Sequence, residues 1–216
     1  YHAPAAPGDA DAPPVSPGDV QETPPLSAEA PRILSQWFAQ SSENRSWVNF
    51  AFLVENPNPM LELRNAEWEA VVYDQADMII GSMWGRIDLL PAGGRQAVVQ
   101  SITVEETDTA SRMEFTITRS GSPQASASPL PLQAGPASYA HYQELDIISG
   151  TVSNSLPQDI PEVTVSALAF DASGKIIGAG GGTFERYFIP GSGQVPVAVK
   201  VKAVGTVDRA ELYLDF

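Results

Sequence analysis

The stretch Phe170-Asp171-Ala172-Ser173-Gly174-Lys175-Ile176-Ile177-Gly178 decides the fold, because the chain contains its pattern twice. The earlier copy reads Tyr73-Asp74-Gln75-Ala76-Asp77-Met78-Ile79-Ile80-Gly81 and lies 97 residues upstream. Each copy has an aromatic residue, an Asp, a short polar segment and an apolar run that ends in Gly. The Asp carboxylate can accept N–H groups of a turn, and Gly174 can supply the positive φ of a hairpin. Both stretches therefore predict two strands joined by a tight turn.

Three further blocks repeat in the same order around this stretch. They are Val54-Glu55-Asn56 with Val152-Ser153-Asn154, Leu90-Pro91-Ala92-Gly93 with Ile189-Pro190-Gly191-Ser192, and Arg112-Met113-Glu114-Phe115 with Arg209-Ala210-Glu211-Leu212. The offsets between partners stay between 97 and 99 residues. Four ordered blocks at nearly one offset indicate a duplicated unit of about 80 to 90 residues, an ordinary domain size. We expect Tyr73 and Phe170 to be equivalent and buried.

Short segments with strand character surround the repeated blocks. In the first copy they cover 47–54, 66–73, 78–80, 97–104 and 113–118, with Gly, Pro and Asn turn signals between them. We find no helical period of adequate length. Short strands at regular spacing with frequent turns are typical of sandwiches. The sequence therefore predicts an all-β protein of two tandem antiparallel β-sandwiches.

The ordered blocks resemble the FxLYD family, a bacterial β-sandwich module related to the late-embryogenesis-abundant type-2 (water-stress) sandwich. The second copy fits the family pattern best, through 150–154, 169–171, 173–178 and 189–191. The resemblance implies that both sandwiches are immunoglobulin-like, that such modules occur on exported and envelope proteins, and that the motif residues are not catalytic.

The first copy departs from the family pattern. The family has a Gly-x-Val-x-Asn block, and Phe52 occupies the position of its Gly. Asp77 occupies the position of the Gly in the following turn, and an Asn-Pro-Asn-Pro insertion lies at 56–59. Both copies have Ala, at Ala70 and Ala167, where the eponymous Phe would lie. The ordered set of blocks, rather than any single motif, carries the resemblance.

Composition sets the domain boundaries. Residues 1–31 contain eight Pro, seven Ala, five acids and no Lys or Arg, so we expect an extended, polyproline-like arm. Residues 120–137 are uncharged and rich in Pro, Ser and Ala, which predicts a semi-stiff linker. The two sandwiches are then expected at 32–119 and 138–216.

Charge and residue types exclude several classes of protein. The formal net charge of −14 is diffuse, and no basic stripe of the kind that nucleic acid binding needs is present. No stretch approaches the roughly 18 to 20 apolar residues of a membrane-spanning helix. The absence of Cys excludes thiolate zinc sites, iron–sulfur clusters and a Cys nucleophile.

No pattern of residues predicts an active site or a cofactor. The two His residues are His2, in the arm, and His141, which we interpret as a surface or strand-edge residue. The acidic loop at 105–108 has no calcium-loop spacing. The glycine run 178–182 lacks the Lys-Ser/Thr and helix of a phosphate cradle, so we interpret it as a bulge or close backbone contact. We therefore expect no catalytic, metal or cofactor residues.

The expected function is a non-catalytic structural subunit of a bacterial extracellular or cell-envelope assembly, of filament or sheath type. In this hypothesis the protein self-associates or binds other envelope proteins, and the arm contacts a neighbouring subunit. The candidate contact residues are Val20, Leu26, Ile33 and Trp37. The alternative is an accessory or binding module of an envelope complex for polysaccharide or protein, with the arm as a spacer.

Overall fold

The regular structure of the described residues is entirely β. The computed structural model describes residues 27–126 and 130–215, without the side chains of 182–185. In the first half the strands are β1 (Arg32–Gln40), β2 (Trp47–Glu55), β3 (Leu61–Tyr73), β4 (Ile79–Leu90), β5 (Arg95–Thr103), β6 (Arg112–Arg119) and β7 (Ser122–Ala125). In the second half they are β8 (Leu132–Ala134), β9 (Ser138–Tyr142), β10 (Leu145–Asn154), β11 (Ile160–Phe170), β12 (Ile176–Ile189), β13 (Gln194–Ala203) and β14 (Arg209–Asp215). The predicted all-β, antiparallel class is confirmed.

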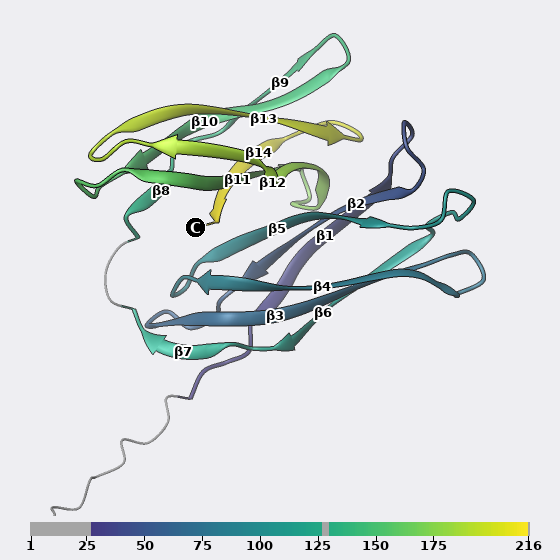
Figure 1. The fold of residues 1–216 in the computed structure, drawn as a ribbon, viewed down its shortest axis with the longest axis horizontal. Helices are drawn as coiled ribbons and strands as arrows, with labels where there is room; N and C mark the ends of the chain where they lie inside the picture. Colours follow the sequence, from purple (N-terminus) through teal and green to yellow (C-terminus); the bar gives the residue numbers. More distant parts are fainter. Residues whose placement is uncertain (1–26, 127–129, 216) are drawn as a thin grey trace, which may run out of the picture.

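The strands form four stacked layers (Figure 1). One outer layer is the β4-β3-β6 sheet with β7 added to β3, and the β1-β2-β5 sheet packs on it. The remaining strands follow the order β14-β11-β12-β13-β10-β8, with β9 on β10. Strands β12 and β13 pair at only two positions, where Gly178 lies opposite Ala203 and Ala179 lies opposite Lys202. This short junction lets the seven-stranded sheet fold into two layers.

Three apolar cores hold the layers together. The first core lies between the two sheets of the first half and is dominated by Phe50, Phe52 and Trp68. The second core lies between the two layers of the second half. The third, which we name the interface core, joins the halves and consists of Ala51, Leu53, Ala97, Leu168, Phe170, Ile176, Ala179 and Tyr213, with Trp37 and Val99 at its margin. Strands β2 and β11 are therefore buried on both faces.

The repeated sequence blocks occupy matching positions in the pairing of the strands. Tyr73 pairs with Ile79 and Arg112, and Phe170 pairs with Ile176 and Arg209. The Arg112 guanidinium lies 3.8 Å from the Tyr73 ring centroid, and that of Arg209 lies 4.1 Å from the Phe170 ring centroid.

The repeated polar residues have structural roles in these turns. Asp74 Oδ1 accepts hydrogen bonds from two turn amides at 2.8 and 2.9 Å, and Asp171 Oδ1 does so at 2.9 and 3.0 Å. Gly174 has a φ of 82°. Buried Asn56 donates to Leu61 O and Pro91 O, and Asn154 donates to Gln158 O and Pro190 O.

The two aromatic residues differ in burial, contrary to expectation. Phe170 is buried because its face of β11 is covered by the first half. Tyr73 is only half-buried, since its face of β3 is the outside of the stack, and its hydroxyl donates to Glu114. The expectation that both are buried was wrong for Tyr73, because packing between the halves covers only one of them.

The segment 120–137 carries strands at both of its ends. β7 pairs with β3, and β8 pairs with β10. Pro123 is compatible with β7 because an edge strand tolerates the loss of an N–H. Composition alone indicated a linker over this whole segment, whereas its ends extend the sheets of the two halves.

The last residues of the segment assigned to the arm lie against the first half. Glu29 N donates to Asn58 Oδ1 at 2.8 Å, and Asn58 Nδ2 donates to Glu29 O at 2.8 Å. Ala28 packs on the first core, and Pro31 is buried. The root of the arm is thus fixed at the turn between β2 and β3. Val20 and Leu26 lie outside the described residues.

We predict that Asn56→Ala and Asn154→Ala each lower the free energy of unfolding by about 2 to 3 kcal/mol, because buried carbonyl oxygens lose their donor. Urea denaturation followed by far-UV circular dichroism measures this effect. The control is Gln36→Ala, at an exposed position of β1. A change of less than about 0.5 kcal/mol for either Asn variant would contradict the structural role.

Candidate functional site

The main candidate site is a cleft where the two halves meet. It has a volume of about 340 Å³, within the range of small-molecule sites. We name it the Trp–Lys cleft and define it by Trp37, Trp47, Asn49, Gln100, Lys200 and Lys202. Its first-half wall is built by β1, β2 and β5, and its second-half wall by β12 and β13.

The first-half wall is aromatic and amide-rich. Trp37 is half-buried at the margin of the interface core, while 40% of Trp47 is exposed at the start of β2. Ser101 Oγ donates to Asn49 Oδ1 at 2.7 Å, which fixes the carboxamide. An indole can stack on a ring or a proline, and the indole N–H and the side-chain amides can donate hydrogen bonds to the polar groups of a ligand.

The glycine run of β12 places main-chain atoms in the wall of the cleft. A Cβ on Gly180 would lie 1.8 Å from Lys200 O, and one on Gly181 would lie 2.2 Å from Val165 O. Gly181 also has a φ of 92°. Side chains are therefore excluded at both positions. The run makes a close backbone contact, as the sequence indicated, and it also forms part of the cleft wall.

The second-half wall concentrates positive charge in an acidic protein. The chain has three lysines, and two of them, Lys200 and Lys202, line this cleft. Lys202 Nζ donates to Ser42 Oγ at 3.2 Å. Within the described residues, neither lysine forms an ion pair with a carboxylate. These two ammonium groups therefore make the cleft suited to an anionic ligand.

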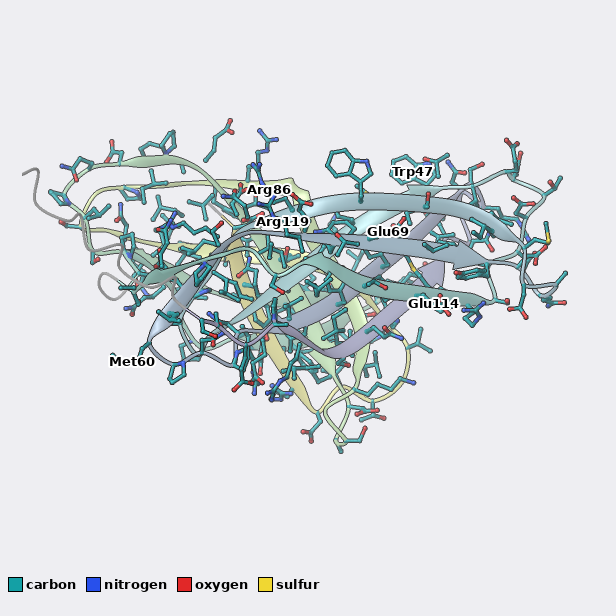
Figure 2. All side chains as sticks on the ribbon, turned by 90° about the horizontal axis from the view of Figure 1, so that it is seen from below. Trp47, Met60, Glu69, Arg86, Glu114 and Arg119 are labelled. Carbon is teal, nitrogen blue, oxygen red and sulfur yellow. The ribbon has the colours of Figure 1, made fainter. Side chains whose placement is uncertain are left out.

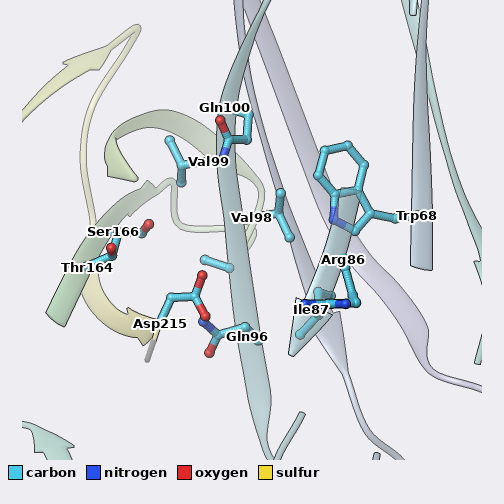
Figure 3. A pocket seen from close by; sticks show the side chains of 11 residues that line it. Trp68, Arg86, Ile87, Gln96, Val98, Val99, Gln100, Thr164, Ser166 and Asp215 are labelled. Carbon is cyan, nitrogen blue, oxygen red and sulfur yellow. The ribbon is translucent and has the colours of Figure 1, made fainter. Parts of the chain in front are cut away.

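A second, smaller cavity lies on the other side of Val99 and Gln100. Figure 3 shows Thr164, Ser166 and Asp215 on one side of β5 and Trp68 and Arg86 on the other. Its volume is about 70 Å³, which has room for a few waters at most. Gln96 Nε2 of the first half donates to Leu214 O of the second half at 2.9 Å. The cavity is therefore best explained as part of the packing between the halves.

The outer face of the β4-β3-β6 sheet carries charges of both signs. Figure 2 shows Glu69, Arg86, Glu114 and Arg119 on this face. Its arginines have carboxylate partners: Arg86 pairs with Asp88, Arg112 with Asp77 and Glu114, and Arg119 with Glu67. This pairing distinguishes the face from the Trp–Lys cleft.

The hairpin of β9 and β10 contains a Tyr–Asp–His cluster. Tyr139 OH donates to Asp146 Oδ1 at 2.6 Å, His141 Nδ1 lies 2.8 Å from the same oxygen, and Ala203 N donates to Asp146 Oδ2. Burial alone would raise the pKa of Asp146, but these hydrogen bonds outweigh it and hold the pKa below its usual value. The cluster ties edge strand β9 to β10 and β13, which explains it structurally.

The acidic loop does not gather its side chains. Glu105 and Glu106 are exposed, while the main chain of Asp108 accepts hydrogen bonds from Gln40 and Arg45. Over residues 27–126 and 130–215, no three His, Asp or Glu side chains are placed to hold a metal ion. The same part of the chain has no helix with the length and apolar character to cross a bilayer.

The structure separates the predicted contact residues from one another. Ile33 packs against the first core, and Trp37 contacts the interface core and the cleft. Sequence reasoning missed Trp47, Lys200 and Lys202 as site residues. One feature of the sequence could have indicated this site: the chain has only three lysines, and two of them lie two residues apart.

Comparisons with known proteins identify no relative. No protein-family model matches the chain, and no curated protein sequence does. Among solved structures, a red sea bream transglutaminase is similar at 13% identity, with a TM-score of 0.27. The alignment covers 88% of this chain and 29% of the transglutaminase chain. A likeness at this level carries no argument about function.

We predict that alkaline pH weakens the interface core through Tyr213. Burial raises the pKa of Tyr213 to about 12, partly opposed by Arg95 and Arg209. A folded-state pKa above the unfolded value of about 10 means that the contribution is complete below pH 10 and is lost as pH rises toward 12. The loss is about 2 to 3 kcal/mol of unfolding free energy.

Urea denaturation from pH 8 to 12 measures this effect by comparing the wild type with Tyr213→Phe. The difference in unfolding free energy between the two proteins should stay constant up to about pH 10 and then shift in favour of the variant. Parallel pH profiles above pH 10 would contradict the assignment.

Proposed function

We propose that the protein is a non-catalytic structural subunit of an extracellular or cell-envelope assembly, of filament or sheath type, in which the N-terminal arm contacts a neighbouring subunit. The observation that carries this proposal is the interface core. It fuses four sheet layers into one block, reinforced by the hydrogen bonds from Gln96 to Leu214 O and from Ile176 N to Ser35 Oγ. A block whose halves share a packed core can transmit load and hold a fixed subunit spacing.

The root of the arm supports the same proposal. The side chain of Asn58 forms two hydrogen bonds with the main chain of Glu29, so the chain leaves the block at a defined point. Residues 1–26 contain seven prolines and little apolar surface, a composition that favours an extended segment able to reach beyond the block. Self-association through such a segment would be heterologous and open-ended, which generates filaments.

The alternative is an accessory or binding module with a polysaccharide or protein ligand, in which the arm is a spacer. The Trp–Lys cleft favours this alternative, because it combines a partly exposed indole, the fixed carboxamide of Asn49 and two lysines in about 340 Å³. In both cases the resemblance to an exported module supports a bacterial extracellular or envelope location.

We predict that deleting residues 1–26 abolishes self-association without unfolding the block. Residues 27–31 stay, because Glu29 and Pro31 contact the first half. Sedimentation velocity over a range of concentrations compares the full chain with the deletion, and thermal denaturation checks that both are folded. The full chain should form larger species as concentration rises, while the deletion should remain monomeric.

The opposite result would favour the alternative. If the deletion associates to the same extent as the full chain, the arm is a spacer and the structural-subunit proposal loses its support. A chain whose Pro residues in 1–26 are kept but whose order is scrambled provides the matched control for length and composition.

A further inference from the structure

We infer that the Trp–Lys cleft of one molecule binds segment 19–25 of the N-terminal arm of a second molecule. This inference rests on the proposed function, and it names the surface and the segment that make the contact. Segment 19–25 reads Asp19-Val20-Gln21-Glu22-Thr23-Pro24-Pro25.

The first argument is charge complementarity. Residues 1–26 contain four carboxylates and no Lys or Arg, while the cleft holds two of the three lysines of the chain. Lys200 and Lys202 are exposed and have no partner among the described carboxylates. An acidic segment is therefore attracted to this cleft on a protein whose net charge is negative.

The second argument is the match between aromatic wall and proline. Proline-rich segments bind in aromatic-lined grooves because the polyproline helix is preformed and loses little entropy. Trp47 is 40% exposed beside the half-buried Trp37, and Pro24-Pro25 follows the two acids of the segment. A polyproline helix leaves its carbonyl groups without internal partners. The Asn49 and Gln100 amides can donate to them.

The third argument is spacing. In a polyproline helix, residues three apart face the same side at about 9 Å, so Asp19 and Glu22 would point the same way. Lys200 and Lys202 lie on one face of β13, about 7 Å apart along the strand. The flexible lysine stems span the difference. Because exposed ion pairs contribute little individually, the Trp contact adds to the affinity and the lysines select the segment.

The fourth argument is the position of the two surfaces on the block. The arm enters at the start of β1, where Arg32 pairs with Glu55, whereas Trp37 and Trp47 of the cleft lie towards the other end of the β1–β2 pair, where Gln40 pairs with Val48. A donor surface at one end and an acceptor surface at the other define a head-to-tail contact. With a second copy as the occupant of the cleft, the assembly is polar.

Charge reversal in the full chain tests this contact. The cleft variant is Lys200→Glu with Lys202→Glu, and the arm variant is Asp19→Lys with Glu22→Lys. Each alone should associate at least about tenfold more weakly than the wild type, because like charges then meet. An equal mixture of the two variants should associate again, because each contact then pairs opposite charges. Sedimentation velocity measures all four samples, and recovery in the mixture shows that both variants are folded.

Matched controls separate the cleft from general effects of charge and aromatic surface. Lys175→Glu removes the third lysine, which is exposed in the turn between β11 and β12, and should leave association unchanged. Trp47→Ala should weaken association severalfold, whereas Trp84→Ala, at an 80% exposed tryptophan outside the cleft, should not. Raising the salt concentration should weaken association of the wild type.

Several results would overturn the inference. If the cleft variant associates like the wild type while deletion of 1–26 abolishes association, the arm binds elsewhere and the proposed function stands without this site. If the arm variant changes the tryptophan emission of dilute monomers, the arm occupies its own cleft. If oligogalacturonate binds through Lys200 and Lys202 while the arm variant associates normally, the cleft is a site for acidic glycans.

Discussion

The burial of β2 on both of its faces is the constraint on which the rest of the structure depends. Phe50 and Phe52 face the first core, while Ala51 and Leu53, between and after them, face the second half. A strand covered on both sides must read as a continuous apolar run rather than an alternating one. The same holds for β11, whose Leu168 and Phe170 meet this face. Small side chains such as Ala51 and Ala179 allow the two sheets to approach closely. This contact joins the two halves, and the cleft lies where they meet.

The interface core also explains how two sequence repeats acquire different surfaces. Tyr73 and Phe170 share strand pairings and an arginine over the ring. Only Phe170 is covered by the other half, whereas the hydroxyl of the half-buried Tyr73 donates to Glu114. Local structure is therefore set by the repeated motif, while the burial of each copy is set by its neighbour.

Local features of the fold could be predicted from the sequence, whereas relations between distant segments could not. The turns at Asp74 and Asp171 have the predicted hydrogen bonds, because a carboxylate and the amides two and four residues on need no outside partner. The sequence predicted a strand at 47–54, but the pattern of apolar residues along a strand does not say what covers each of its faces. The edge strands β7 and β8 were hidden by their proline-rich composition.

The candidate site was harder to predict for the same reason. Its residues come from β1, β2, β5 and β13, and the Ser42–Lys202 hydrogen bond joins residues 160 positions apart. No short motif can report such an arrangement. Trp37 was singled out as a contact residue, yet part of its ring surface is used within the chain. The scarcity of lysine was the one global property that pointed to this region.

Two differences between the copies supply the surfaces of the proposed contact, whereas the residues that the copies share are explained by the fold. The shared Asp and Asn residues close turns and bridge strands, so they are explained by the fold. The Asn-Pro-Asn-Pro insertion occurs in the first copy alone, and its Asn58 fixes the root of the arm. At the offset of 97 residues, Met83 and Trp84 of the first copy correspond to Gly180 and Gly181 of the second. Those glycines let β12 approach Lys200 and Val165 too closely for any side chain, and so they shape the cleft. These two departures, at Asn58 and at Gly180-Gly181, supply the root of the arm and part of the cleft wall, the two surfaces on which the proposed head-to-tail contact rests.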